Sequence, residues 1–171
     1  HAGVGSRRRR AAGKVRPGQK VLINGASGGV GVYAVQIAKS LGAEVTAVCG
    51  ASNAELVRSL GADHVVDYTS EDFTRSGCSY DLILDNVASR TFAEYRRVLA
   101  PGGRVIPNSG NAGIGYILKA FARSLYAPQQ GRPLVSAPNQ ADLLTLRDML
   151  VDGRLKPVIG ATFSLAETPE A

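Results

Sequence analysis

The sequence contains few of the residues that hold covalent or metal-bound folds together. Its 171 residues include two cysteines, two histidines, one methionine and no tryptophan. Cys49 and Cys78 stand far apart and lack the paired Cys-x-x-Cys spacing of a zinc site, so neither a disulfide framework nor a bound metal is expected. We expect two free thiols, with Cys49 buried at a strand end. A hydrophobic content of 44% is enough for one packed core.

Long apolar stretches are also missing. No stretch approaches the roughly 20 consecutive apolar residues of a membrane-spanning helix, and no apolar signal-peptide segment precedes the fold. The sequence therefore predicts no membrane span, and a cytoplasmic location is the simplest expectation.

Acidic residues are absent from the first 20 positions, which hold seven Lys or Arg, including the run Arg7 to Arg10. The rest of the chain carries 13 Lys or Arg against 14 Asp or Glu, although the whole chain has a net charge of +6. A nearly neutral globular part lacks the basic surface that nucleic-acid binding requires. We interpret residues 1–19 as a solvated basic segment and residues 20–171 as one domain. Contact with a polyanion or a membrane surface is the alternative for the arginine run.

From Lys20 onward, short β-branched runs alternate with segments of helical periodicity, which is typical of βαβ units in a parallel sheet. Ser52 and Glu55 have the spacing of a capping box, and Asn139 is the expected cap of the last helix. The predicted strands are 21–23, 45–48, 64–66, 82–84, 104–106 (after a turn at 101–103) and 158–159. The predicted helices are 31–41, 52–60, 89–99, 114–126 and 139–152. The sequence thus indicates an α/β fold, a doubly wound parallel sheet of about six strands with helices on both faces.

A glycine-rich loop, Gly-Ala-Ser-Gly-Gly-Val-Gly at 25–31, joins the first strand to the first helix. Glycines let the backbone turn tightly and approach a pyrophosphate, while the helix N-terminus supplies N–H groups and a positive dipole. Gly28 and Gly31 match G-x-G-x-x-G, and Ala26 takes the place of the first glycine. This placement predicts a dinucleotide-binding Rossmann fold, whose candidate contacts are Ala26, Ser27, Gly28, Gly29, Val30 and Gly31.

Two other enzyme classes use similar loops. Short-chain dehydrogenases need a tyrosine followed four residues later by lysine, and none of the six tyrosines has one. Adenosylmethionine methyltransferases bind ribose through an acid at the end of the second strand, where this chain has Val48, Cys49 and Gly50. Neither class fits.

The missing acid also bears on the cofactor. An Asp or Glu about 20 residues past the loop binds the ribose 2′-OH of NAD and repels the 2′-phosphate of NADP. Gly50, Ser52 and Asn53 offer space and donors there instead, so NADP(H) is favoured over NAD(H). Simple helix capping is an equal alternative for Ser52.

Four sequence motifs occur in the same order as in the zinc-independent medium-chain dehydrogenase/reductases of the quinone oxidoreductase type, and they resemble the motifs of that family. They lie at 25–31, 60–68, 80–87 and 101–105. The resemblance implies a cofactor-binding domain without zinc, in an oxidoreductase that transfers a hydride to a quinone, enone or other carbonyl. It also implies that Tyr68 lies near the adenosine phosphate. The residues implied to line the nicotinamide path are Asn86, Val87, Ser109 and Gly110.

We expect the family's GroES-like catalytic lobe to be absent from this segment, and therefore binding of the dinucleotide without efficient catalysis. No catalytic residue is assigned, the substrate would require the missing lobe, and His64 is expected to be structural. A non-catalytic regulatory or interaction module is the alternative. A further expectation is a homodimer formed through an apolar surface, namely Ile114, Ile117, Leu118, Phe121 and Leu125.

Overall fold

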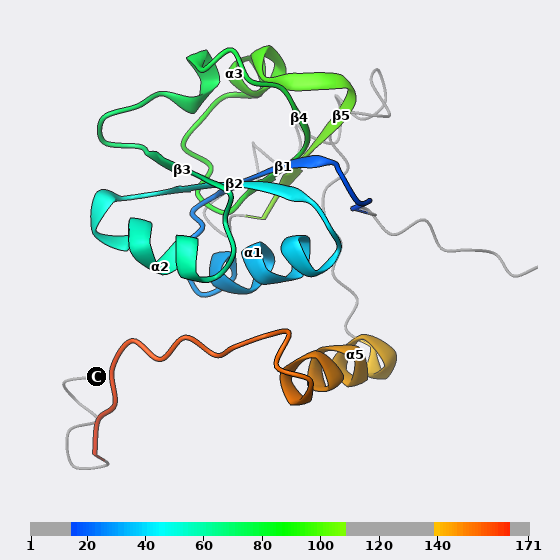
Figure 1. Ribbon diagram of the computed structural model, residues 1–171. Coiled ribbons are helices and arrows are strands. Elements are labelled where there is room, and N and C mark those ends of the chain that lie inside the picture. The colour runs from blue at the N-terminus through cyan, green and yellow to red at the C-terminus, as the bar shows by residue number, and fades with distance from the viewer. Residues whose placement is uncertain (1–14, 109–138, 165–171) are drawn as a thin grey trace, which may run out of the picture. The chain divides into compact units, whose positions relative to one another are not determined.

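A computed structural model describes residues 15–108 and 139–164 of the chain (Figure 1). The chain divides into two compact units, residues 1–137 and 138–171. In the first unit, strands and helices alternate as the sequence predicts. Its elements are β1 (Lys20–Asn24), α1 (Gly31–Ser40), β2 (Glu44–Cys49), η1 (Ala51–Asn53), α2 (Ala54–Ser59), β3 (His64–Asp67), η2 (Phe73–Arg75), β4 (Tyr80–Asp85), α3 (Phe92–Arg97) and β5 (Leu99–Pro107).

The five strands form one parallel sheet in the order β3-β2-β1-β4-β5. This is the strand order of a Rossmann fold. The fold class is confirmed, although the sixth strand predicted at 158–159 is wrong, because these residues have no strand conformation. Their flanking residues include Pro157, which cannot donate to a strand ladder.

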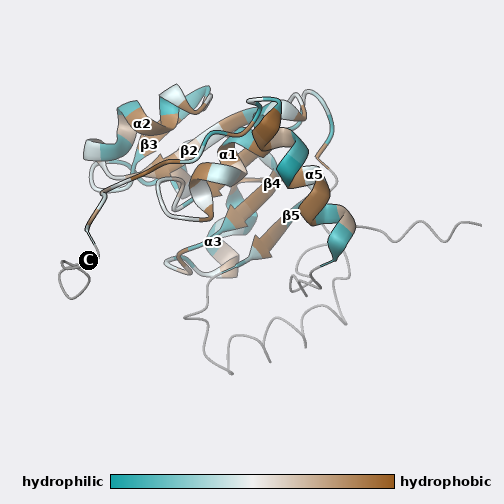
Figure 2. Cartoon of the chain, turned by 90° about the horizontal axis from the view of Figure 1, so that it is seen from below, coloured by the Kyte–Doolittle hydropathy of each residue, from teal (hydrophilic) through white to brown (hydrophobic). Residues whose placement is uncertain are grey.

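The two faces of the sheet pack against different elements, as the period-2 alternation of a strand requires. In β1, Val21 and Ile23 join the core cluster that includes Val35 of α1 and Val57 of α2. Leu22 joins the opposite cluster, whose largest members are Phe73 and Tyr95. Figure 1 accordingly shows α1 and α2 on one side of the sheet and α3 on the other, and Figure 2 shows hydrophobic residues along β4 and β5.

The capping box predicted at Ser52 and Glu55 is wrong. Ser52 lies inside the short 3₁₀ helix η1, and α2 begins at Ala54 after Asn53, with no side-chain hydrogen bond at either cap. Glu55 binds Arg58 instead, with 2.8 Å between Oε1 and Nη1. The i, i+3 ion pair has replaced the predicted contact with the backbone.

The third helix is shorter than predicted. A capping box does exist here, because Thr91 accepts from the Glu94 N–H while Glu94 accepts from the Thr91 N–H, so α3 begins at Phe92 rather than Ser89. The turn predicted at 101–103 lies within β5, at a register shift opposite β4. A Cβ on Gly103 would lie 2.7 Å from the Tyr80 carbonyl oxygen, so the glycine permits this close strand contact.

The second unit contains α5 (Gln140–Val151). The Asn139 side chain accepts from the Asp142 N–H at 2.9 Å, which confirms the predicted cap. The predicted helix at 114–126 lies outside the described residues.

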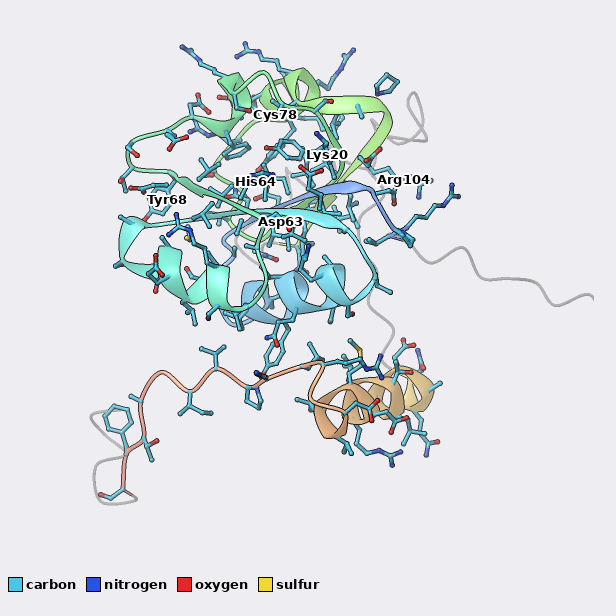
Figure 3. The ribbon with its side chains drawn as sticks, in the orientation of Figure 1. Lys20, Asp63, His64, Tyr68, Cys78 and Arg104 are labelled. Atoms are coloured by element: carbon cyan, nitrogen blue, oxygen red, sulfur yellow. The ribbon has the colours of Figure 1, made fainter. Side chains whose placement is uncertain are left out.

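Asp63 joins three segments of the first unit (Figure 3). Both of its carboxylate oxygens lie 2.8 Å from Lys39 Nζ at the end of α1, and Oδ2 accepts from the Val45 N–H of β2 at 2.7 Å. Partial burial opposes ionisation, but the hydrogen bonds from Lys39 and Val45 outweigh it and lower the pKa of Asp63. The charged carboxylate therefore stabilises this corner.

We expect Asp63→Asn to lower the free energy of unfolding by about 1 kcal/mol at pH 7, a modest value because the pair is partly solvated. The wild-type advantage is present above the unfolded pKa of about 3.9 and is lost as the pH falls through the lower folded pKa. Urea unfolding at pH 7 and at pH 3 measures it. Glu71→Gln, at an exposed acid outside this corner, is the control. A difference of equal size at both pH values would contradict the assignment.

Candidate dinucleotide site

The candidate site lies at the carboxyl edge of the sheet, where the strand order reverses between β1 and β4. The chain after β1 passes to α1 on one face, and the chain after β4 passes toward α3 on the other. Open α/β sheets bind ligands at this switch point, because the two departing loops diverge there.

The glycine loop is held in shape by backbone contacts. Gly25 has a φ of +76°, and the Val48 carbonyl of β2 accepts from the N–H groups of both Gly25 and Ala26, at 3.1 and 3.0 Å. Ala26 is fully buried. The loop is thus tied to the neighbouring strand before α1 begins.

The glycines of this loop differ in what the fold requires of them. A Cβ on Gly31 would lie 2.2 Å from the Gly25 carbonyl oxygen and 2.6 Å from that of Ala26, so only glycine fits. A Cβ on Gly28 would make only an ordinary contact at 3.5 Å, and one on Gly29 would meet nothing within 4 Å. Packing therefore explains Gly31 but leaves the space beside Gly28 and Gly29 open.

Two backbone donors of this loop have no acceptor among the described residues. The Gly28 N–H donates to the Gly25 carbonyl at 3.3 Å, and the Gly28 carbonyl accepts from Val32. Within residues 15–108 and 139–164, no acceptor is found for the N–H groups of Gly29 and Val30. Two donors at the positive end of a ten-residue helix suit an anion.

We expect Gly31→Ala to destabilise the chain by about 3 kcal/mol, because the methyl group would displace the backbone of Gly25 and Ala26. Gly29→Ala is the matched control, and it should change the free energy of unfolding by less than about 1 kcal/mol. Denaturant unfolding of the two variants measures the difference. Equal stabilities would show that the loop does not require glycine at 31.

A second group of predicted residues gathers where β2 ends. A Cβ on Gly50 would contact the Tyr68 side chain at 3.6 to 3.9 Å, so the tyrosine packs beside this glycine. Figure 3 shows Tyr68 at the edge of the first unit. Tyr68 is 61% exposed. The side chains of Ser52 and Asn53 cap no helix and have no hydrogen-bond partner in the described part of the chain. The structure therefore brings Gly50 and Tyr68 together beside two free polar side chains.

The charge at this end of β2 comes from neighbouring elements. Register pairing sets Cys49 beside Asp67 of β3. Burial raises the pKa of the Cys49 thiol, which is 2% exposed as expected, and the Asp67 carboxylate raises it further, while Arg58 opposes them. Hydrogen bonds from the Thr69 N–H and hydroxyl lower the pKa of Asp67. The Asp67 carboxylate and the Arg58 guanidinium thus both act on the thiol at the end of β2.

The loop after β4 contacts the glycine loop directly. A Cβ on Gly25 would lie 2.8 Å from Cγ2 of Val87 and 3.4 Å from Cβ of Asn86, so these residues cover the glycine. The Asn86 Oδ1 accepts from Asn108 at 2.9 Å, but its buried Nδ2 has no partner within the described ranges. This buried donor is thus left unsatisfied among the described residues. Ser109 and Gly110 lie outside the described residues.

The fully buried Asp85 holds that loop. Its Oδ1 accepts from Asn24 Nδ2 and from the N–H groups of Val87 and Ala88, at 3.0, 3.1 and 3.0 Å. Ala88 has a φ of +59°, a strained conformation for a non-glycine residue. Asp85 therefore fixes the conformation of the segment that carries Asn86 and Val87.

The sequence-based prediction missed these polar residues. Asn24 and Asp85 are buried at the ends of β1 and β4, and the half-buried Asn108 follows β5. The available signal was a polar residue at the carboxyl end of each apolar run, since such residues meet at one edge of a parallel sheet.

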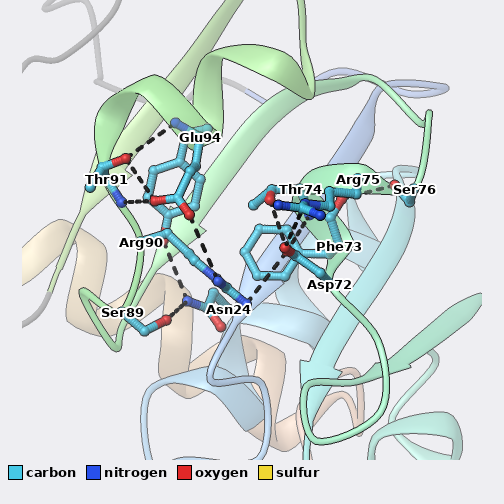
Figure 4. Close-up of polar contacts among 11 residues, drawn as sticks. Asn24, Asp72, Phe73, Thr74, Arg75, Ser76, Ser89, Arg90, Thr91 and Glu94 are labelled. Carbon is cyan, nitrogen blue, oxygen red and sulfur yellow. Dashed lines mark hydrogen bonds and ion pairs between the residues drawn. The ribbon is translucent and has the colours of Figure 1, made fainter.

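Arg90 ties this region to the connection between β3 and β4 (Figure 4). Its guanidinium lies 3.4 Å from Asp72 and 3.8 Å from Glu94, and its Cζ is 5.8 Å from the centre of the Phe73 ring. The arginine thus joins η2 to the start of α3.

The described residues contain no group of three or more His, Cys, Asp or Glu that could hold a metal ion. His64 is exposed at the start of β3, with Nε2 3.1 Å from Glu44 Oε1. It therefore lies at the opposite edge from the glycine loop. None of the described helices is long and apolar enough to cross a membrane.

A model of the family described as zinc-binding dehydrogenase matches residues 60–171. The chain belongs to this family. It resembles the chloroplast envelope quinone oxidoreductase homolog of Arabidopsis thaliana, with 36% identity over 88% of this chain and 47% of that protein. It is also 35% identical to a mitochondrial NAD(P)H oxidoreductase of Mus musculus, over 90% of this chain and 44% of that protein. The chain spans about half the length of these relatives.

Solved structures of the same superfamily have the same fold. The quinone oxidoreductase from Coxiella burnetii superposes with a TM-score of 0.75 at 26% identity, over 90% of this chain and 47% of that one. The CurK enoyl reductase superposes with a TM-score of 0.73 at 28% identity, over 92% and 51%. The predicted membership of the medium-chain dehydrogenase/reductase superfamily is confirmed.

Proposed function

We propose that this zinc-binding dehydrogenase family chain binds NADP(H) and forms the cofactor half of an oxidoreductase. The observation that carries the proposal is the open space at Gly28 and Gly29, where packing would accept a side chain and the sequence has none. A pyrophosphate approaching the backbone accounts for both glycines. The N–H groups of Gly29 and Val30 would bind it, assisted by the dipole of α1.

The residues near Gly25 suit the nicotinamide end of the dinucleotide. Val87 is 47% exposed and offers an apolar surface, while the Asn86 Nδ2, unpartnered in the described part of the chain, offers a hydrogen bond to a carboxamide oxygen. The reduced nicotinamide would supply a hydride to a quinone, enone or other carbonyl. The relatives are about twice as long as this chain. We propose that the part of a relative that this chain does not match positions the acceptor and excludes water, so that this chain alone catalyses hydride transfer slowly.

We expect Gly28→Val to weaken dinucleotide binding at least about a hundredfold, because its methyl groups would keep the pyrophosphate from several charge-assisted hydrogen bonds. The fold should persist, since the new Cβ makes an ordinary contact. Calorimetric titration with NADPH measures the affinity. Gly160→Val, at a position with open space in the second unit, is the control. Unchanged affinity in a folded Gly28→Val variant would overturn the proposed site.

NADPH is the preferred nucleotide in this proposal, because Gly50 takes the place of the acid that in NAD-binding domains ends β2 and repels a 2′-phosphate. The Ser52 hydroxyl and the Asn53 amide are free to donate to it.

Absence of zinc, a cytoplasmic location and a homodimer stay predictions. Two of the relatives are a chloroplast and a mitochondrial protein, and the residues predicted to pair two copies lie outside the described ranges.

Gly50→Asp should reverse the preference from NADPH to NADH. The new carboxylate would accept from the ribose 2′-OH and repel the 2′-phosphate, which corresponds to roughly a tenfold loss of NADPH affinity. Its Cβ fits beside Tyr68 at ordinary contact distance. Affinities for both nucleotides test this, with Gly50→Ala as the control that adds a Cβ without charge. Tighter NADH binding by the unmodified chain would contradict the preference.

A further inference from the structure

Arg58 presents a cation close to the end of β2. Its Nη1 lies 2.8 Å from Oε1 of Glu55, which stands in the first turn of α2. Long side chains on a helix lean toward its N-terminus, and this ion pair holds the guanidinium over that first turn. The turn follows η1, which begins immediately after Gly50. The guanidinium therefore lies on the same segment as the free side chains of Ser52 and Asn53.

The electrostatics of Cys49 agree with this placement. Arg58 lowers the pKa of the Cys49 thiol, against the upward effects of burial and Asp67. Cys49 is the last residue of β2, so the positive charge acts at the strand end that precedes Gly50. No basic residue occupies positions 49 to 57, and the cation arrives from the second turn of the helix instead.

We propose that Arg58 binds the 2′-phosphate of NADPH, and that its ion pair with Glu55 breaks when the phosphate binds. This inference rests on the proposed function. A guanidinium offers two parallel N–H groups to phosphate oxygens and stays charged at any working pH. The pair with Glu55 is easily exchanged, because the Arg58 and Glu55 side chains are 54% and 91% exposed and exposed ion pairs contribute little.

Asp67 is the negative charge that the arginine would offset. Its carboxylate lies beside the end of β2 but is occupied by the Thr69 N–H and hydroxyl, at 3.0 and 2.8 Å. The hydrogen bonds keep the group ionised, so it would repel a 2′-phosphate without Arg58 to offset it. NADH carries no such phosphate. The effect of Arg58 is therefore confined to the phosphorylated nucleotide.

Calorimetric titration of the full chain with NADPH and NADH tests the proposal. We expect Arg58→Gln to weaken NADPH binding about tenfold and to leave NADH within about twofold. Arg75→Gln is the matched control, because Arg75 also makes an exposed i, i+3 pair, with Asp72, but lies on η2, against the opposite face of the sheet. Glu55→Gln should tighten NADPH binding about twofold, since it removes the competing carboxylate.

An unchanged ratio of NADPH to NADH affinity in folded Arg58→Gln would overturn the role of Arg58. Thermal unfolding checks that the variant is folded. If it is not, Arg58→Lys decides, because it keeps the charge but loses the paired N–H groups and should weaken NADPH binding by an intermediate factor. An Arg58→Lys variant that binds NADPH as tightly as the wild type would then overturn it. Absence of binding of both nucleotides to the unmodified chain would instead overturn the proposed function itself.

Discussion

The missing side chain of Gly31 is the constraint on which the rest of the site depends. Because nothing projects from its Cα, α1 can begin against the carbonyl groups of Gly25 and Ala26. The helix therefore starts within a few residues of the end of β1, and its free N–H groups point to the carboxyl edge of the sheet. A larger residue would push the helix away and move those donors out of reach of the switch point.

A second constraint sets the other side of that edge. Asp85 uses one oxygen to bind Asn24 and the loop that carries Asn86 and Val87, so the ends of β1 and β4 share a single buried polar junction. Val87 then covers Gly25. The glycine loop and the proposed nicotinamide contacts are consequently parts of one packed arrangement. Burying an aspartate is costly unless its oxygens accept hydrogen bonds. Oδ1 of Asp85 accepts three, whereas its buried Oδ2 has no partner among the described residues.

The strands and the glycine loop were predictable because their signals are local. Apolar runs bounded by turns identify β1 to β4, and a glycine loop between a strand and a helix is typical of a phosphate-binding turn. The errors arose where two local patterns competed. Ser52 and Glu55 matched a capping box, but Glu55 pairs with Arg58 and the chain forms a 3₁₀ turn instead. The turn signal at 101–103 was absorbed into β5 because Gly103 packs on a carbonyl of β4, a contact that only the tertiary structure reveals.

The charges at the end of β2 show why the remaining part of the site was not predictable. Sequence reasoning examines the residue that ends the strand, and here it finds Gly50 and an absent acid. The parallel register places Asp67 of the next strand beside Cys49, so an acid is present at this edge after all, 17 residues further along the chain. The cation that opposes it comes from a helix turn between the two strands. In our proposal, nucleotide preference at this edge therefore depends on the charges that three elements bring together and not on position 50 alone.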